Sequence, residues 1–369
     1  MTIQRNIGKA AIVAAGLFLE VSATAYAQDF TAAETAIKQH QQLPVFAPKG
    51  LPFDAKACMA GKRILSIPVS SANPFNKAII RAEIAAAKSV GFEVTEWENQ
   101  ARPTQWVQGV EYATTNKFDA VELLGGVNPA VLGPQIAAAR AAGVKVFVSD
   151  LYDTTQPADA NIDSYLSVPY NQVGDLLANW VIAKSGGKAN VLIVGSDEVV
   201  PTAPYVKGIT DRLNKDCPKC KHSYINAPIP EWSTKIQTGV QSALIANPTI
   251  NYVIPIYDSM TQFVIPAITI TGKKDQVKIA TFNGTPFVLD ALRNGDVEMD
   301  IGKSIGWVGR TILDAYMRKL CGLETYTELY APLYIFDKSN VETVGVPAVV
   351  DKGYGDGYID GFAKLWGLK

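Results

Sequence analysis

The chain has 369 residues, of which 48% are hydrophobic and 19% are charged, with 34 Lys and Arg against 35 Asp and Glu. This composition is that of a globular protein of about two domains, and it excludes a disordered chain. The balanced charge leaves no basic surplus to neutralise phosphates, so we expect no nucleic-acid partner. Only two histidines are present, which argues against histidine-based metal sites and catalytic triads.

The first 27 residues have the pattern of a secretory signal peptide. Arg5 and Lys9 open the chain, an apolar run covers positions 10–19, and the sequence Ala-Tyr-Ala at 25–27 is typical of a signal peptidase site. The apolar run is too short to remain as a membrane span. A buried N-terminal helix is the alternative interpretation. The pattern predicts an exported chain that begins near Gln28.

A first series of alternating strands and helices follows an extension at 28–60, which is predicted to be a helix and then a loop. Arg63–Val69 is a short apolar strand, and Lys77–Val90 has helical spacing and a Gly91 stop. Three helices between four strands predict right-handed crossovers and a parallel sheet. The remaining elements are strands at 92–97, 120–124 and 144–149 and helices at 105–115 and 130–142.

A second series of the same kind begins after 162–169, a segment without helical period that we expect to cross between two lobes. The predicted fold class is therefore α/β, with one mainly parallel sheet in each lobe. The expected strands lie at 190–194, 223–226, 252–256, 278–282, 297–301 and 333–336, and the expected helices at 173–183, 205–213, 234–246, 287–293 and 305–320.

Two motifs suggest a chemistry that the rest of the sequence does not support. Residues 302–306 (GKSIG) fit G-x-S-x-G between a strand and a helix. The corresponding triad needs a histidine after the serine, and none follows His222, so a glycine-flanked helix start is the simpler interpretation. Residues 351–360 (DKGYGDGYID) lack the spacing and final Glu of an EF-hand loop. We expect a surface tail there, and no metal or cofactor.

All four cysteines lie in the exported part, where disulfides persist. Four cysteines allow three pairings, and the sequence alone does not choose between them. Cys217 and Cys220 have redox C-x-x-C spacing, but that chemistry needs the first Cys at the start of a helix that follows a strand. Here the pair follows a helix, so we expect inert structural bridges. The other two are Cys58 and Cys321.

Polar and aromatic residues gather at the carboxyl ends of the predicted strands, where open parallel sheets bind ligands. Taken singly, a structural role is the simpler interpretation of each: a helix cap for Asn73 and Asp258, a turn for Asp150 and Asn283, and the core for Phe75 and Trp232. Together, amides and carboxylates with flat aromatics, and no base, metal or nucleophile, are typical of a sugar site. Asp and Asn bond pairs of hydroxyls, and aromatic rings cover the C–H face of a sugar. The candidates are Ser71, Asn73, Phe75, Asp150, Trp232, Asp258, Asn283 and Asp300.

An exported two-lobed βα chain that opens with Ile67–Phe75 (IPVSSANPF) resembles the type I periplasmic sugar-binding proteins of ABC importers, the ribose-binding-protein-like family. The resemblance covers roughly Gly61–Leu320. It implies two Rossmann-like lobes joined by a hinge of three chain crossings, a periplasmic monomer without enzymatic activity, and an ABC permease as partner. The implied lobes are 61–163 with 301–327, and 164–300 with 328–369.

The same resemblance assigns roles to the candidate residues. The family's Asn-Pro-Phe binds the sugar, which implicates Asn73 and Phe75. Its Asp at the end of the fourth strand matches Asp150, and its aromatic residue at the start of a second-lobe helix matches Trp232. The matches are looser where the family has Asn-Asp, Phe-Asp-Gly and a hinge Gln; here these positions hold Tyr257-Asp258, Phe282-Asn283-Gly284 and Asp300.

The chain departs from the ribose pattern at its arginines. Ribose binders place Arg after the strand-four Asp and again in the second lobe, whereas this chain has Leu151, Thr202 and Ala203. An anionic ligand would meet uncompensated negative charge in such a cleft. We therefore expect another small neutral sugar or sugar alcohol, although Lys77 or Lys303 is close enough in sequence to reach the cleft.

The lobe architecture also bears on the cysteines. In a βα lobe the helices run back from the cleft, so the end of helix 305–320 and the start of strand 63–69 lie at the same pole. Cys58 and Cys321 share that pole, and the other two cysteines lie at the pole of the second lobe. The expected bridges are Cys58–Cys321 and Cys217–Cys220.

Three alternatives accompany the leading interpretation of a solute-binding protein that delivers its ligand to an ABC permease. A sugar-responsive repressor shares the lobes, but the signal peptide and the lack of an N-terminal helix-turn-helix oppose it. An exported carbohydrate-active enzyme needs only two carboxylates, for which Asp150 and Asp258 are candidates. A receptor that docks on a chemotaxis or sensor protein differs only at the surface.

Overall fold

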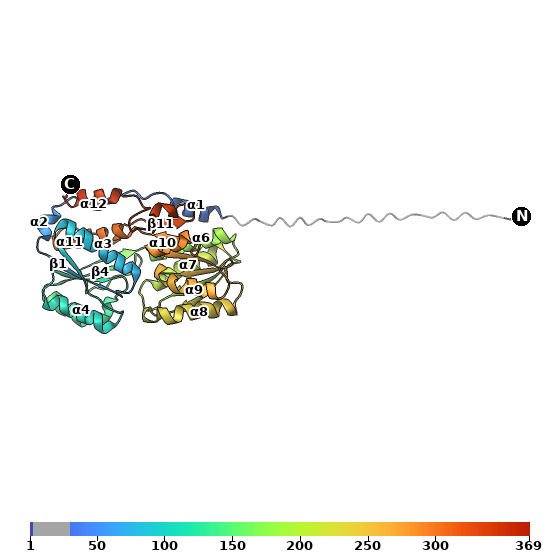
Figure 1. Cartoon of the computed structure of the whole chain (residues 1–369), viewed down its shortest axis with the longest axis horizontal. Helices are drawn as coiled ribbons and strands as arrows, with labels where there is room; N and C mark the ends of the chain where they lie inside the picture. The colour runs from blue at the N-terminus through green and yellow to red at the C-terminus, as the bar shows by residue number, and fades with distance from the viewer. Residues whose placement is uncertain (3–29) are drawn as a thin grey trace.

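Two sheets, one in each lobe, organise the chain in the computed structural model, which describes residues 1–2 and 30–369. The predicted signal peptide lies outside the described residues. The first sheet is entirely parallel, in the order β2-β1-β3-β4-β5, and the second has the order β11-β10-β9-β8-β6-β7, with only β11 antiparallel. The α/β fold class with two Rossmann-like lobes is confirmed (Figure 1). The strands are β1 Arg63–Pro68, β2 Glu93–Glu96, β3 Ala120–Leu124, β4 Lys145–Asp153, β5 Ser164–Val168, β6 Asn190–Gly195, β7 Lys221–Asn226, β8 Tyr252–Pro255, β9 Lys278–Asn283, β10 Met299–Gly302 and β11 Tyr334–Asp337.

Helices cover both faces of the sheets, as buried apolar strands require. Local signals fix several of their ends: Asn73 caps α3 and Ser304 caps α11, while Gly91 ends α3 with a φ of 102°. The helix start predicted at 302–306 is thus confirmed. The helices are α1 Thr31–Gln39, α2 Ala55–Met59, α3 Pro74–Val90, α4 Pro103–Thr115, α5 Gly133–Ala141, α6 Tyr170–Ser185, α7 Thr202–Asp216, α8 Trp232–Ala246, α9 Thr261–Ile270, α10 Pro286–Arg293, α11 Ile305–Leu320 and α12 Gly357–Leu365, with short 3-10 turns η1 Pro129–Leu132, η2 Ile229–Glu231, η3 Asp258–Met260 and η4 Val341–Val344.

The chain crosses between the lobes after β5, between β10 and α11, and again after α11. β5 pairs with β4, so the first crossing begins at Pro169 and not at the boundary expected between Asp163 and Ser164. Ser167 of β5 donates its backbone N–H to Thr327 at 2.8 Å and accepts one from Leu329 at 2.9 Å. The first and last crossings are therefore joined by backbone hydrogen bonds and form one hinge.

An N-terminal strap, which we define as residues 41–54, adds a further connection between the lobes (Figure 1). It starts where α1 packs on α6 of the second lobe, and His40 there accepts a hydrogen bond from Ile335 of β11 at 2.8 Å. It ends at the first lobe, where Phe53 donates to Leu365 at 3.0 Å and α2 packs against α11. The strap thus spans both lobes on the hinge side.

The C-terminal tail, residues 338–369, also spans both lobes and is not the plain surface tail expected from its sequence. Ala348 donates to Asp290 of α10 at 2.9 Å, and Asp351 accepts from Gly306 of α11 at 2.7 Å. Tyr358 packs against the ring of Trp307, with centroids 4.9 Å apart. The aromatic residues of the tail anchor it to the lobes. The glycines between them interrupt any regular apolar spacing, so this packing was not predicted from the sequence.

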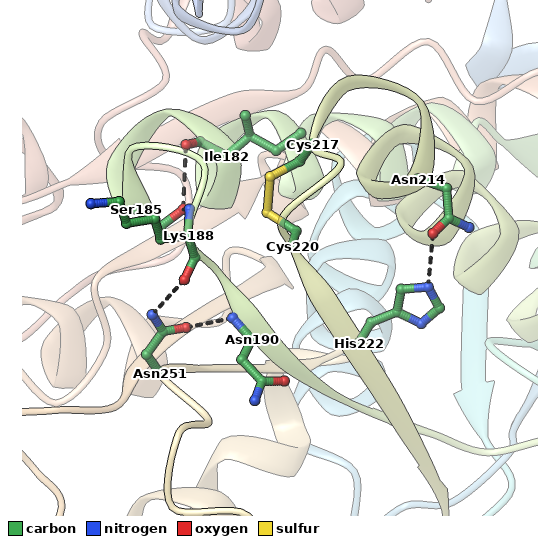
Figure 2. The surroundings of a disulfide bond; sticks show 9 residues. All are labelled: Ile182, Ser185, Lys188, Asn190, Asn214, Cys217, Cys220, His222 and Asn251. Carbon is green, nitrogen blue, oxygen red and sulfur yellow. Dashed lines mark hydrogen bonds between the residues drawn. A yellow bond between two sulfur atoms is a disulfide. The ribbon is translucent and has the colours of Figure 1, made fainter. Parts of the chain in front are cut away.

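The structure contains the two disulfides expected from the lobe poles, Cys58–Cys321 and Cys217–Cys220. The first joins Cys58 of α2 to Cys321 at the end of α11. The second joins the end of α7 to the start of β7 across three positions, as Figure 2 shows. Cys217 follows a helix and does not begin one, so the arrangement that lowers a thiol pKa in redox motifs is absent from this part of the described chain.

A buried pair of carboxyl groups lies inside the first lobe, away from the cleft. Glu122 of β3 accepts hydrogen bonds from the hydroxyls of Ser66, Ser149 and Tyr316. Glu83 of α3 lies beside it and is fully buried. Burial first, and then the charge of Glu122, raise the pKa of Glu83 well above its usual range. The folded protein therefore favours the uncharged form of Glu83 more strongly than the unfolded chain does.

We expect Glu83→Gln to make stability less dependent on pH. A carboxyl whose folded pKa is raised stabilises fully below its unfolded pKa, and the contribution is lost as pH rises through the folded pKa. The variant cannot ionise, so its free energy of unfolding should exceed that of the wild type by about 1 kcal/mol or more near pH 8, and by less near pH 5. Urea denaturation at both pH values measures the difference.

The exposed substitution Glu98→Gln is the matched control. It should leave the pH profile unchanged. Parallel stability profiles for Glu83→Gln and the wild type would contradict the raised pKa.

Candidate functional site

A narrow cavity lies between the lobes, at the carboxyl ends of the strands in both sheets. Among the predicted site residues, Asn73, Phe75, Asp150, Trp232, Tyr257 and Asn283 line it, whereas Ser71, Asp258 and Asp300 do not. The two lobes contribute equally. The first lobe supplies Val69, Asn73, Phe75, Asn76, Gly125 and Asp150, and the second lobe supplies Tyr170, Val199, Ile229, Trp232, Tyr257 and Asn283.

The N-terminus of α3 forms one wall of the cavity. The Asn73 side-chain oxygen accepts hydrogen bonds from the backbone N–H groups of Phe75 at 3.0 Å and Asn76 at 3.2 Å. The Ser259 hydroxyl of the second lobe donates to the same oxygen at 3.4 Å. The helix-cap role therefore occupies this oxygen, and the Asn73 side-chain N–H₂ is the group left for a ligand.

Asp150 is held by a buried lysine that sequence reasoning did not place among the site residues. Asp150 lies in β4 with a φ of 56°, a conformation that costs an L-residue energy and is often found at functional sites. Lys303, in the crossing between β10 and α11, is fully buried and its Nζ donates to the Asp150 carboxylate. The Nζ atom also lies 5.1 Å from the ring centre of Phe75 and 5.2 Å from that of Phe282.

The burial of Lys303 acts against its own charge. Desolvation lowers the pKa of Lys303, and the charge of Asp150 opposes that shift. Removing either partner would leave the other as an unpaired buried charge, which costs several kcal/mol. The only signal in the sequence was the position of Lys303 directly after a strand that ends near the cleft.

Trp232 and Tyr257 form the aromatic wall of the second lobe. The indole N–H of Trp232 donates to the Ser196 hydroxyl at 2.9 Å and to the Ala227 carbonyl at 3.0 Å, and the side chain is 7% exposed. The Trp232 ring is stacked on Tyr257 with an interplanar angle of 26°. The indole therefore offers a ligand its face and not its N–H group. The Tyr257 hydroxyl is buried without a partner in the described part of the chain.

Asp258 and Asp300 are fully buried and are not among the residues that line the cavity, although the sequence predicted a ligand-binding role for both. Asp258 accepts a hydrogen bond from the backbone of Thr285 at 2.7 Å, and Asp300 accepts one from Gly284 at 3.2 Å. Burial raises the pKa of Asp258 to about 7 and that of Asp300 well above its usual range. These two groups hold the turn that follows β9 and thereby place Asn283 at the cavity.

Ser71 does not line the cavity either, and it is hydrogen-bonded to the backbone of Asn99. It accepts a hydrogen bond from the backbone N–H of Asn99 at 3.1 Å, and its own N–H donates to the Asn99 carbonyl at 3.0 Å. These bonds fasten the loop before α3 to the segment after β2. Ser71 therefore supports the position of Asn73 from behind.

Sequence reasoning missed Asn76, Gly125 and Tyr170. The side-chain N–H₂ of Asn76 is buried without a partner in the described residues, and Gly125, with a φ of 63°, approaches Asn76 so closely that a Cβ atom would clash. The Tyr170 hydroxyl donates to the Asp150 carbonyl at 3.1 Å. The glycine pair at 125–126 after the third strand was a usable signal, because a strained turn at a strand end often marks a ligand.

Two further observations concern residues 30–369. In that range, no three His, Cys, Asp or Glu side chains are placed to share a metal ion. No helix of this described part combines the length and apolar character that a membrane crossing requires.

The sequence matches the profile of the periplasmic binding protein domain over residues 64–324. No curated protein sequence matches it. Among solved structures, an ABC transporter solute-binding protein from Agrobacterium vitis with bound allitol is 21% identical, with a TM-score of 0.68, covering 77% of this chain and 98% of that one. A carbohydrate transporter from Acidothermus cellulolyticus in complex with myo-inositol is 20% identical, with a TM-score of 0.66, covering 80% of this chain and 100% of that one.

A third similar structure is the 5-methylthioribose transporter solute-binding protein of Thermotoga lettingae in complex with 5-methylthioribose. It is 21% identical, with a TM-score of 0.67, and the alignment covers 75% of this chain and 87% of that one. At these identities the likeness shows the fold.

We expect Trp232→Ala to weaken ligand binding by more than tenfold, because a desolvated aromatic anchor contributes on the order of 2 kcal/mol. Trp232→Phe is the matched variant: it keeps a flat ring but loses the bonds to Ser196 and Ala227, so it should bind within a few-fold of the wild type. Calorimetric titration of folded variants tests this. Wild-type affinity in Trp232→Ala would show that the ring only fills the core.

We expect Lys303→Met to weaken binding by at least tenfold and to lower the melting temperature, because Asp150 is left as an unpaired buried carboxylate. The double variant Lys303→Met/Asp150→Asn removes that charge and should recover most of the lost stability. Thermal melts and titrations measure both effects. Lys88→Met, an exposed lysine on α3, is the control. No recovery in the double variant would contradict the pairing.

Proposed function

The chain belongs to the periplasmic binding protein domain family, and we propose that it captures a small neutral sugar or polyol between its lobes and delivers it to an ABC permease. The observation that carries the proposal is the inter-lobe cavity, to which each lobe contributes half of the lining. A ligand in this position contacts both lobes only when they are closed. Its binding free energy therefore favours the closed form.

The groups around the cavity favour a neutral, hydroxylated ligand. The Asn76 side-chain N–H₂ and the Tyr257 hydroxyl are buried without partners in the described chain, and such groups are costly unless a ligand bonds them. A sugar hydroxyl both donates and accepts, so it suits an amide, a phenol and a carboxylate at once. No Lys or Arg is among the described residues that line the cavity, and the Lys303 ammonium behind it is already paired with Asp150, which leaves an anionic ligand in the cavity without a counter-charge.

The similar structures support the same ligand class. Those from Agrobacterium vitis, Acidothermus cellulolyticus and Thermotoga lettingae carry allitol, myo-inositol and 5-methylthioribose, which are uncharged polyhydroxylated molecules. The predicted signal peptide and the paired cysteines favour the periplasm as the location, since disulfides persist there.

The geometry favours this role over a carbohydrate-active enzyme. Glycoside hydrolysis needs two carboxyl groups that flank the substrate. Asp258 lies behind the cavity wall with Thr285, and Asp150 is bound to Lys303, so the two candidates do not face each other across the cavity. Docking on a sensor protein in place of a permease remains an alternative that concerns only the outer surface.

We expect a thermal-shift screen of pentoses, hexoses and polyols to identify at least one neutral ligand that raises the melting temperature, since ligands of the native state stabilise it. Calorimetry should then show little dependence on salt, because no net charge is neutralised. Small-angle scattering should show a more compact form with ligand. Tight binding of a sugar acid or sugar phosphate, with its neutral counterpart inert, would contradict the proposal; turnover of the sugar would favour the enzyme.

A further inference from the structure

A second hollow adjoins the ligand cavity on the outer side of the cleft. This outer groove encloses about 710 Å³, part of it open to solvent, and it shares Asn73, Ile229 and Trp232 with the inner cavity. Its lining again comes from both lobes. The residues are Ser70, Ala72, Asn73, Pro74, Gln100 and Ala101 of the first lobe, and Ile229, Pro230, Trp232, Ser233, Gln262 and Phe263 of the second.

The residues that separate the two spaces belong to different lobes. Asn73 is fixed by its cap bonds at the start of α3, and Trp232 is fixed by its bonds to Ser196 and Ala227. Because the two side chains are held by different lobes, the lobe opening that the proposed function requires would move them apart and join the inner cavity to the outer groove. A ligand longer than the inner cavity would then lie in both spaces, with the bond that joins its two parts between Asn73 and Trp232.

We propose that the outer groove holds a second neutral, hydroxylated group joined to the sugar in the inner cavity, so that the ligand is a glycoside or a disaccharide. The inference rests on the proposed function of the inner cavity and extends it. It concerns the part of the ligand that projects past Asn73 and Trp232 toward solvent.

The chemistry of the groove selects this class of substituent. None of its lining residues is charged, and Gln100 and Ser233 are exposed and make no side-chain hydrogen bond in the described structure. Gln262 donates to the Ser259 carbonyl at 2.7 Å, and Phe263 adds a ring beside it. Amides and a hydroxyl beside aromatic and proline surfaces suit a sugar ring, whose hydroxyls need partners and whose C–H face needs apolar contact.

A third hollow on the cleft rim shows that neutrality is particular to this groove. That hollow is lined by Lys77, Arg81 and Arg310, with Asp351 as its one acidic residue. A phosphate or carboxylate substituent would find its counter-charges there and none in the outer groove. The uncharged lining therefore favours a neutral substituent.

The test compares free sugars with their glycosides. Thermal shift first selects the free sugar or polyol that binds best from pentoses, hexoses and hexitols, and the methyl glycosides and disaccharides that contain each sugar are screened alongside. Calorimetry then gives the affinity of each matched pair for the wild type, Ser233→Phe and Gln100→Ala. Ser233→Phe fills the groove without breaking a described hydrogen bond, and Gln100→Ala removes an amide from the facing lobe.

We expect a glycoside or disaccharide to bind the wild type at least as tightly as its free sugar. Ser233→Phe should weaken that binding by tenfold or more, and Gln100→Ala by several-fold, while the affinity of the free sugar changes less. Ser242→Phe is the matched control, because Ser242 is an exposed serine of the same helix, α8, and does not line the groove. It should bind both members of each pair as the wild type does.

Two outcomes overturn the inference in distinguishable ways. In the first outcome, free sugars bind but every glycoside and disaccharide fails, or the variants weaken both members of a pair equally. This would show that the groove is only an entrance, and the proposed function would stand. If no member of either panel binds, the proposed function fails and the groove inference fails with it.

Discussion

The buried ion pair of Lys303 and Asp150 links the hinge of the molecule to its ligand cavity. Lys303 belongs to the crossing between β10 and α11, and Asp150 belongs to β4, so one contact joins this crossing to the wall of the site. Lys303 is fully buried and Asp150 is only 5% exposed, so separating the two charges inside the protein would be costly. The pair therefore fixes where the second crossing meets the first lobe.

Several polar side chains do not line the cavity but hold the backbone segments that carry the lining residues. Asp258 and Asp300 hold the turn at 283–285, and Ser71 holds the loop before α3. Each of these side chains makes bonds to backbone N–H groups, which fixes a neighbouring residue at the cavity. This explains why polar residues cluster at the strand ends in larger numbers than the cavity can accommodate.

Hydrophobic periodicity predicted most of the fold, because buried strands and amphipathic helices have distinct spacings. It failed at α9, where Thr261–Ile270 is apolar on nearly every side and contains Pro266, and at the tail, where glycines separate buried tyrosines. Strand-end position found Asn73, Asp150 and Trp232. Position at a strand end could not distinguish a cavity residue from a supporting one such as Asp300, since both types are polar and follow strands. Apolar lining residues could not be predicted in this way, because they look like any other core residue.

The bridge between Cys58 and Cys321 joins positions 263 residues apart, whereas Cys217 and Cys220 are 3 residues apart. A chain that crosses a membrane from its N-terminus presents Cys58 first and Cys321 last, with the close pair emerging between them. Closing the short loop early removes both of its thiols from competition, because nearby ends meet far more often than distant ones. The first lobe is also incomplete until α11 is present, because α11 packs on α3. For the export proposed above, the order in which the cysteines emerge would thus protect the long-range bridge from the wrong partners.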